Sequence, residues 1–289
     1  MTAGLTTFAN ISARVNDLIE DSLAVARMAN YLTPTVTQLS AMGMMDRKVN
    51  EYNAVTFVQA GEDDDTSAQQ FTKDALATLT PASYRTRIDI TDQRAETDFD
   101  AEMANAALEF GSASAKHIDS SIADNFSSAT GGTIGTAGTV LTWTHITAAH
   151  SILIDKGIPA GSPVYCALHP YQWWRLVNAS TIAGATVSVA PNFQDRMTAA
   201  PNYFQVPQFQ GITFVISNSI DIDASDDAYG AIYVPGAFAV DMRKPLNVRP
   251  ERDESRELTE LNASMWYAAG VWRSDFAVAI LSDASTPSV

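Results

Sequence analysis

The longest regular pattern in this chain lies at residues 97–126, and it limits the possible folds more than any other segment. Apolar or small residues recur there at intervals of three and four, the spacing of one face of an amphipathic helix. Thr97 and Asp100 resemble a capping box at its start, and Gly131 and Gly132 follow its end. We therefore predict one helix about 45 Å long, because a helix rises about 1.5 Å per residue. The residues of its apolar face are Phe99, Met103, Ala106, Ala107, Phe110, Ala113, Ile118, Ile122 and Phe126.

A helix of that length needs a partner surface, and the end of the chain offers one. Strand-forming residues dominate at 246–248, 258–272 and 276–281, which predicts long antiparallel strands. We expect the apolar face of the helix to pack on these strands. The expected contact joins Phe99, Met103 and Phe110 of the helix to Met265, Val271 and Phe276 of the strands.

The charge of the chain limits its partners. The net charge is -15, from 33 acidic and 18 basic residues, which argues against a sequence-reading nucleic-acid binder or a protein of anionic membranes. No segment approaches the roughly 18 apolar residues of a membrane span, and the N-terminus lacks the features of a signal peptide. The single cysteine, Cys166, excludes an internal disulfide and fits a reducing compartment. We therefore expect a soluble protein without a membrane partner.

Two shorter patterns precede the long helix. Residues 7–30 predict an amphipathic helix with a polar face of mixed charge, suited to docking on a protein, and Pro34 ends it. Residues 53–59 and 84–90 read as strands that pair into a hairpin. Their connection is far longer than a usual hairpin loop, and an isolated two-stranded ribbon is marginal in water, so we expect the hairpin to need another chain. Met42, Met44 and Met45, between these patterns, suit either an irregular core or a contact surface.

The middle of the chain predicts a mixed α and β subdomain. A helix at 145–156, capped by Thr144, is followed by a buried strand at 164–168 and a second helix that starts at Pro170. Further strands are expected at 212–217 and 228–234, with a surface excursion of residues 191–211 before them. Together with the long helix and terminal strands, this order indicates the α+β class.

No catalytic constellation emerges from the sequence. The four histidines, His117, His145, His150 and His169, lack zinc-ligand spacing. Cys166 and His169 lack a visible orienting acid, so a packed strand thiol is favoured over a nucleophile. The glycine-rich segment 127–138 follows a helix and lacks the lysine of a phosphate loop. We expect no catalytic residue, cofactor or metal, although the acidic run at 62–65 fits either an exposed loop tip or a weak cation site.

The order of these parts resembles the major capsid proteins of tailed double-stranded DNA bacteriophages, the HK97-like fold. The resemblance rests on the arm helix, the long-tipped hairpin, the spine helix and two segments, ALHPYQWWRL and AVDMRKPLNVRPERDESRELTELNASMWYAAGVWRSDFAVAIL. It implies five regions, which are an N-terminal arm (1–46), an E-loop hairpin (47–92), the P-domain spine helix with its following loop (93–138), an A-domain (139–237), and the P-domain strands with the C-terminus (238–289).

The resemblance implies a structural subunit and no enzyme. It would self-assemble into hexameric and pentameric capsomers of an icosahedral head that encloses double-stranded DNA, contacted without sequence specificity. Assembly would take place in the bacterial host cytoplasm, and the protein would reside in the virion capsid. A separate scaffolding protein and a portal protein are expected partners, with decoration or cement proteins as further candidates. The alternatives are an encapsulin-type nanocompartment shell and, from another class, a cytosolic cysteine-dependent α/β hydrolase.

The expected contacts between subunits lie in two charged segments, the hairpin with its strands and the turn after residue 248. The turn carries both signs of charge, and either a solvated hairpin tip or a set of intersubunit salt bridges accounts for it. The candidate contact residues are Glu62, Asp63, Asp64, Asp65, Lys73, Arg85, Arg87, Arg249, Glu251, Arg252, Asp253, Glu254, Arg256 and Glu257.

Overall fold

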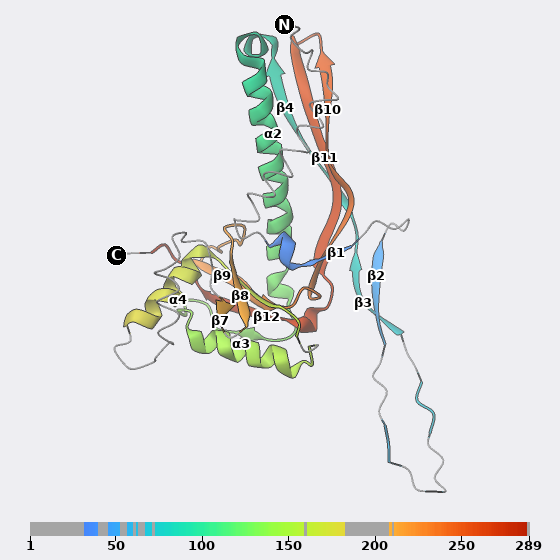
Figure 1. Cartoon of the computed structure of the whole chain (residues 1–289), viewed down its shortest axis with the longest axis vertical. Helices are drawn as coiled ribbons and strands as arrows, with labels where there is room; N and C mark the ends of the chain where they lie inside the picture. The colour runs from blue at the N-terminus through green and yellow to red at the C-terminus, as the bar shows by residue number, and fades with distance from the viewer. Residues whose placement is uncertain are drawn as a thin grey trace.

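The structure is a computed structural model, and it contains two main sheets and a projecting hairpin (Figure 1). A long helix lies along a four-stranded sheet, a six-stranded sheet sits at the lower end of that helix, and the hairpin extends away from both. The structure describes residues 32–39, 46–52, 57–59, 62, 67–70, 73–158, 161–182, 208–209 and 211–287.

The predicted long helix is confirmed as α2, Asp92–Ala123, with 32 residues. It begins five positions before Thr97, so the predicted capping box is wrong. The reason is that β4, Ala82–Thr91, runs directly into the helix. The Asp92 amide donates to the Glu257 carbonyl at 3.0 Å, which fixes the first turn to the turn between the long strands. The helix ends before Phe126, which is fully buried in a 3₁₀ turn, η2, Phe126–Ser128.

The four-stranded sheet has the order β1-β10-β11-β4. The long strands β10, Phe238–Asp253, and β11, Leu258–Val271, form an antiparallel pair, and β4 pairs antiparallel with β11 over its whole length. The short strand β1, Thr37–Leu39, adds to β10 in parallel. It follows a 3₁₀ turn, η1, Thr33–Thr35.

One face of this sheet packs on α2. Ala106 and Phe110 of the helix are buried in a cluster with Val248, Leu261 and Ala263 of the long strands. Removing such apolar surface from water stabilises the fold by about 25 cal/mol per Å². The prediction that the apolar face of the long helix packs on the long strands is therefore confirmed.

The predicted partners of Phe110 are wrong in position. Met265 and Phe276 belong to a second, larger cluster together with Ile118 and Ile122 of the helix. The reason is that α2 and β11 run in the same direction, so each successive helix turn meets a later part of the strand. Phe110 meets the first half of β11, and Ser121 reaches the Tyr267 hydroxyl at 2.8 Å. The side chains of Phe99 and Met103, and thus their part in the prediction, lie outside the described residues.

The six-stranded sheet has the order β5-β12-β9-β6-β8-β7. The middle strands were predicted closely, because β6 spans Val164–Leu168, β8 spans Ile212–Ile216 and β9 spans Asp227–Tyr233. The edge strands are β5, Thr133–Ile134, and β7, Gln208–Phe209.

The placement of the last strand differs from the prediction. Residues 276–281 were expected among the long strands, but β12, Ala277–Asp283, pairs with β9 in the six-stranded sheet. A 3₁₀ turn, η3, Ser274–Phe276, redirects the chain after β11. Four consecutive residues at the start of β12 are fully buried there, so this position buries more apolar surface than the edge of the long sheet offers.

Two helices accompany the six-stranded sheet, as predicted. The first, α3, Trp143–Asp155, packs on β9 and β12. Its N-cap is Thr142 and not the predicted Thr144, because the Thr142 amide donates to Nδ1 of His145 at 3.3 Å. The second, α4, Pro170–Ile182, begins with the predicted proline and buries Trp173 and Leu176.

The hairpin forms from other strands than predicted. Its strands are β2, Arg47–Tyr52, and β3, Lys73–Leu79. Of the predicted first strand, residues 57–59 are described and have no strand structure, whereas 84–90 lie in β4 and pair with β11. The reason is burial, since the alternate apolar residues of β4 face α2 instead of a solvated ribbon.

Three expectations fall outside the described residues. These are the helix at 7–30, the packing of Met42, Met44 and Met45, and most of the excursion at 191–211. Within the described part of the chain, no helix is long and apolar enough to cross a membrane.

We predict that Gly131→Ala destabilises the junction between the two sheets. The Gly131 amide donates to the carbonyls of Ser274 and Ala277, and a Cβ at this position would lie 2.3 Å from the Ala277 oxygen. Relieving a backbone clash of this kind costs about 3 kcal/mol. Urea unfolding of the monomeric protein measures the change in free energy.

The matched control is Gly236→Ala. No atom lies within 4 Å of a Cβ built at that position, so its free energy of unfolding should change by less than about 0.5 kcal/mol. Equal destabilisation of the two variants would contradict the proposed clash.

Candidate subunit-contact surface

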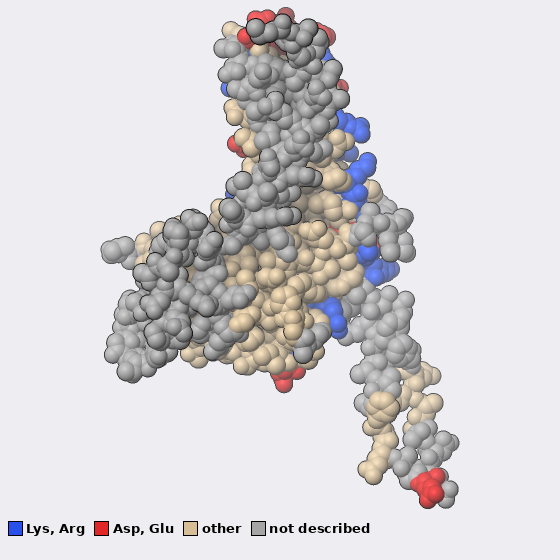
Figure 2. Space-filling view, in the orientation of Figure 1, with Lys and Arg blue, Asp and Glu red and all other residues tan. Residues whose placement is uncertain are grey.

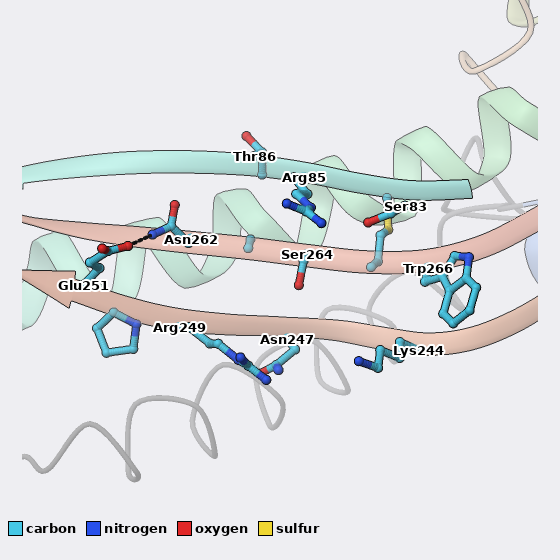
Figure 3. A pocket seen from close by; sticks show the side chains of 13 residues that line it. Ser83, Arg85, Thr86, Lys244, Asn247, Arg249, Glu251, Asn262, Ser264 and Trp266 are labelled. Atoms are coloured by element: carbon cyan, nitrogen blue, oxygen red, sulfur yellow. Dashed lines mark hydrogen bonds between the residues drawn. The ribbon is translucent and has the colours of Figure 1, made fainter. Parts of the chain in front are cut away.

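The face of the long sheet opposite α2 forms an open, polar groove of about 750 Å³ (Figure 3). Its side chains come from β4, β10 and β11. Among them, only Ala263 also belongs to the buried cluster beneath α2. The polar side chains that define it include Arg85, Lys244, Asn247, Arg249, Asn262 and Ser264, with Trp266 at one end.

Strand geometry explains why this face is polar. Successive side chains of a strand point to opposite faces. In β11, Leu261, Ala263 and Met265 are buried, and the residues between them point the other way. Register then brings rows of polar groups together, because Arg249 and Arg87 both flank Asn262.

Several of the predicted contact charges are paired within the chain. Arg87 binds Asp89 and Glu260, each at 3.0 Å, and Arg256 approaches the same two carboxylates at 3.5 and 3.6 Å. These four side chains form one network that joins β4, β11 and the turn before β11. Such a network holds β4 and β11 in register and leaves these charges partly neutralised.

The charged turn between β10 and β11 is also tied internally. Arg252 donates to both carboxylate oxygens of Asp92, from Nη1 to Oδ1 and from Nη2 to Oδ2, the latter at 2.6 Å. Its Nε also binds Glu254 at 3.2 Å. The hydrogen bond from Arg252 lowers the pKa of Asp92, and hydrogen bonds from Ser255 lower the pKa of Asp253. Because these groups are exposed, solvent screens their interactions. The Arg252–Asp92 pair attaches the turn to the start of α2, and the other contacts lie within the turn itself.

Two further predicted residues complete this end of the sheet. The Glu251 carboxylate accepts a hydrogen bond from Nδ2 of the Asn262 side chain at 3.2 Å. Glu257 occupies the left-handed region with φ of 49°, so it serves as the turn residue that brings the chain back into β11.

Three basic side chains of the groove have no ionic partner among the described residues. They are Arg85 of β4 and Lys244 and Arg249 of β10. Figure 3 shows them along the same face of the sheet, and Figure 2 shows Lys and Arg gathered along the side of the molecule away from α2. This face therefore presents positive charge that the described part of the chain does not neutralise.

The hairpin presents groups of the opposite kind. Glu62 lies in an exposed turn, and Figure 2 shows acidic atoms at the far end of the hairpin. Phe57 is 102% exposed and Val58 is 69% exposed, which is unusual for large apolar side chains that lie close together. The hairpin thus combines acidic charge with apolar surface.

Sequence reasoning missed part of this surface. Lys244, Asn247 and Trp266 were not among the candidates, although the alternation of buried and polar residues in β11 could have placed Trp266 on the outer face. Asp63, Asp64 and Asp65 lie outside the described residues, and so does the side chain of Lys73. For these four residues the role in contacts stays a prediction.

The alternative site around Cys166 lacks the geometry of a nucleophile. Cys166 is fully buried in β6, and burial raises the pKa of its thiol. His169 is also buried, and its Nδ1 accepts a hydrogen bond from the Tyr171 amide at 3.2 Å. Among the described residues, no group of His, Cys, Asp and Glu side chains could hold a metal ion.

Comparison with solved structures identifies the fold. The cyanophage P-SCSP1u capsid is 16% identical, with a TM-score of 0.63 and 87% of each chain covered. A Mycobacterium phage Che8 structure is 17% identical, with a TM-score of 0.63 over 82% of this chain and 84% of the other. The Ralstonia phage GP4 capsid is 9% identical, with a TM-score of 0.65 and 88% of each covered. These similarities confirm the predicted α+β, HK97-like capsid fold.

Comparison of sequences identifies the family. No curated protein matches the chain. A family model described as "Phage capsid protein" matches residues 75–280, which is more than half of the chain and includes α2 and most strands of both sheets. The chain therefore belongs to the phage capsid protein family, and it is a structural shell protein of the bacteriophage virion capsid.

Proposed function

We propose that this protein is the major shell subunit, which assembles through hexameric and pentameric capsomers into an icosahedral head around a double-stranded DNA genome. The observation that carries the proposal is that one chain displays two complementary, unsatisfied surfaces. The hairpin exposes apolar and acidic side chains, and the long sheet exposes basic ones. Two such surfaces on one subunit suit a contact that repeats from each copy to the next.

The proposed domain division follows the predicted one with changes at β4 and at the C-terminus. The arm is 1–46, and the E-loop, predicted as 47–92, is the hairpin at 47–81. β4 at 82–91 joins the P-domain because it pairs with β11, and the spine helix with its loop follows up to residue 138. The A-domain, predicted as 139–237, also takes in β5 and β12, since both strands lie in the six-stranded sheet. The remainder of 238–289 supplies the long P-domain strands.

In the proposed contact, the E-loop of one subunit lies over the P-domain sheet of its neighbour. The acidic run Glu62–Asp65 would approach Arg85, Lys244 and Arg249 of that sheet, because these basic groups lack an ionic partner among the described residues. An exposed ion pair contributes only about 0.2–1 kcal/mol, so the charges mainly set register. Phe57 and Val58 supply the apolar area that gives the contact its strength.

The other predicted contact residues have a secondary role in this proposal. Lys73 and Glu257 remain candidate contacts at the ends of the hairpin and of the sheet. The paired residues Arg87, Glu251, Arg252, Asp253, Glu254 and Arg256 would contact a neighbour only through what their in-chain partners leave accessible.

The remaining parts of the proposal concern the partners of the shell. The net charge of -15 suits a wall that confines DNA and contacts it without tight or sequence-specific binding. We propose a separate scaffolding protein and a portal protein as partners, with decoration or cement proteins as further candidates. Assembly would take place in the host cytoplasm. The protein would act as a building block and not as an enzyme.

Electron microscopy of the purified protein tests shell formation directly. We expect icosahedral particles from the wild type, and we expect the genome of the phage inside particles isolated from infected cells. Monomers that never form shells under any assembly condition would refute the proposal. Particles that enclose protein cargo in place of DNA would favour the nanocompartment alternative.

Shortening the hairpin tests its role. Replacing residues 53–72 by a short Gly-Ser turn keeps β2 and β3 and removes the tip, including Phe57 and Glu62. The variant should remain a folded monomer with a circular dichroism spectrum like the wild type, but it should not form shells. Shells of normal yield from this variant would exclude the hairpin from the contact.

Reversing the charge of the groove tests its register. Arg85→Glu with Arg249→Glu should raise the protein concentration needed for assembly about tenfold, which corresponds to about 1.4 kcal/mol lost per contact. Glu62→Lys, added to this variant, should restore part of the assembly. Light scattering as a function of protein concentration measures both effects.

The control for this pair is Lys116→Glu with Lys156→Glu, which changes the charge equally at an exposed residue of α2 and at the exposed residue that follows α3. It should leave the assembly threshold within about twofold of the wild type, since exposed surface charges contribute little. If both pairs impair assembly alike, the effect is one of net charge and the assigned groove is wrong.

Thiol labelling tests the cysteine-dependent enzyme alternative. Because burial raises the pKa of Cys166, it should not react with a maleimide in the native state at pH 8, and it should react after unfolding in urea. Mass spectrometry counts the labels. Rapid labelling of the native protein would show that the Cys166 thiol is accessible and reactive, and it would support the enzyme alternative.

A further inference from the structure

A buried ion cluster lies at the root of the hairpin. Asp241 of β10 is fully buried, and its carboxylate binds two arginines. Arg47, the first residue of β2, approaches it at 3.2 Å through Nε and at 3.4 Å through Nη2. Arg243, from the same strand as Asp241, approaches at 2.8 Å through Nη2. The cluster therefore joins the hairpin to the long sheet across 194 positions of sequence.

The other strand of the hairpin is held by an apolar contact, in which Leu79 fits between small residues of the long sheet; we call this contact the Leu79 socket. Leu79, the last residue of β3, is only 4% exposed and packs on Ala239 and Ala268. A Cβ added to Gly270 would lie 2.7 Å from the Leu79 side chain, so the absence of that carbon makes room for the leucine. Arg47 and Leu79 are register partners across β2 and β3. Both strands of the hairpin are thus attached to the long sheet at the same register pair, Arg47 and Leu79.

The connection between the hairpin and β4 of the long sheet is short. Only Thr80 and Pro81 separate β3 from β4, and Pro81 is buried with a fixed φ. A two-stranded ribbon has little stability by itself. Its direction relative to the body of the subunit must therefore come from restraints at its root.

We propose that Asp241 is a positioning residue, which together with the Leu79 socket fixes the direction in which the hairpin leaves the subunit. This inference rests on the proposed function, because the direction matters only if the hairpin meets a neighbour. A hairpin held in place before assembly loses less conformational entropy when the contact forms, and this preorganisation strengthens the contact without adding atoms to it.

The chemistry of the cluster favours such a role. A buried carboxylate left without a partner is strongly destabilising, so Asp241 needs a cation within the protein. Arg243 supplies one from its own strand, and Arg47 adds a second from the hairpin. Loss of Arg47 therefore removes the tether but still leaves Asp241 a partner. Arg47→Gln separates positioning from folding, whereas Asp241→Asn would leave two arginines without their shared acceptor.

Spin labels on the monomer test the direction of the hairpin. Gln59→Cys and Lys156→Cys place labels on exposed residues of the hairpin and of the end of α3, while the buried Cys166 stays unlabelled. Double electron-electron resonance should give one narrow distance distribution in the otherwise wild-type protein. With Arg47→Gln the distribution should widen at least twofold, and Arg47→Lys, which keeps the charge, should restore most of the narrow distribution.

The same variants are then compared for assembly and stability. Arg47→Gln should reduce shell yield at least tenfold while the melting temperature stays within a few degrees, and Arg47→Lys should recover much of the yield. Lys116→Gln, which removes one charge from the exposed surface of α2, serves as the control and should change neither the distance distribution nor the yield.

Each outcome decides a different point. A broad distribution in the wild type, or an equally narrow one with Arg47→Gln, overturns the positioning role. A broadened distribution with normal shell yield shows that the direction does not matter for assembly, and this also overturns the inference. If the wild type forms no shells while Arg47→Gln still broadens the distribution, the proposed function fails and the anchoring of the hairpin stands.

Discussion

The apolar seam between α2 and the long strands is the constraint on which the rest of the structure depends. Phe110 and Ala106 cover one face of β10, β11 and β4, where Val248 and Leu261 are buried. Because strand side chains alternate, burying that face leaves the opposite one polar. The groove with its basic side chains thus follows from the same packing that buries the opposite face of the sheet against α2.

Charges have two distinct uses in this subunit. Arg252 and Asp92 tie the turn to α2, and Arg87 joins carboxylates on β4 and β11, so these pairs serve the chain itself. Arg85 and Arg249 of the groove have no such partner among the described residues. This difference reduces the charged candidates to the few that a neighbouring subunit can bind. It could be recognised only from the tertiary structure, which shows which charges are already paired.

Local patterns predicted the elements well where one periodicity dominates. The spine helix was found from its spacing, because burial on one side imposes a period of 3.6, whereas β6 and β11 were found from their runs of apolar and strand-forming residues. The errors arose where a pattern fixes a strand but not its partner. Residues 84–90 alternate as a hairpin strand would, yet they pair with β11, and β12 joins the six-stranded sheet. The capping box at Thr97 failed because β4 already feeds the helix from Asp92.

The sequence by itself determined the helix, the strands and, through their order, the resemblance to capsid proteins, because local hydrophobic spacing is written along the chain. Only the tertiary structure decided which strands pair, which arginines stay without an ionic partner, and how Asp241 meets Arg47. The physical reason is that pairing depends on which surfaces become buried together, and this involves residues nearly two hundred positions apart. No local period carries that information, so the candidate contact surface and the root of the hairpin could not be read from spacing.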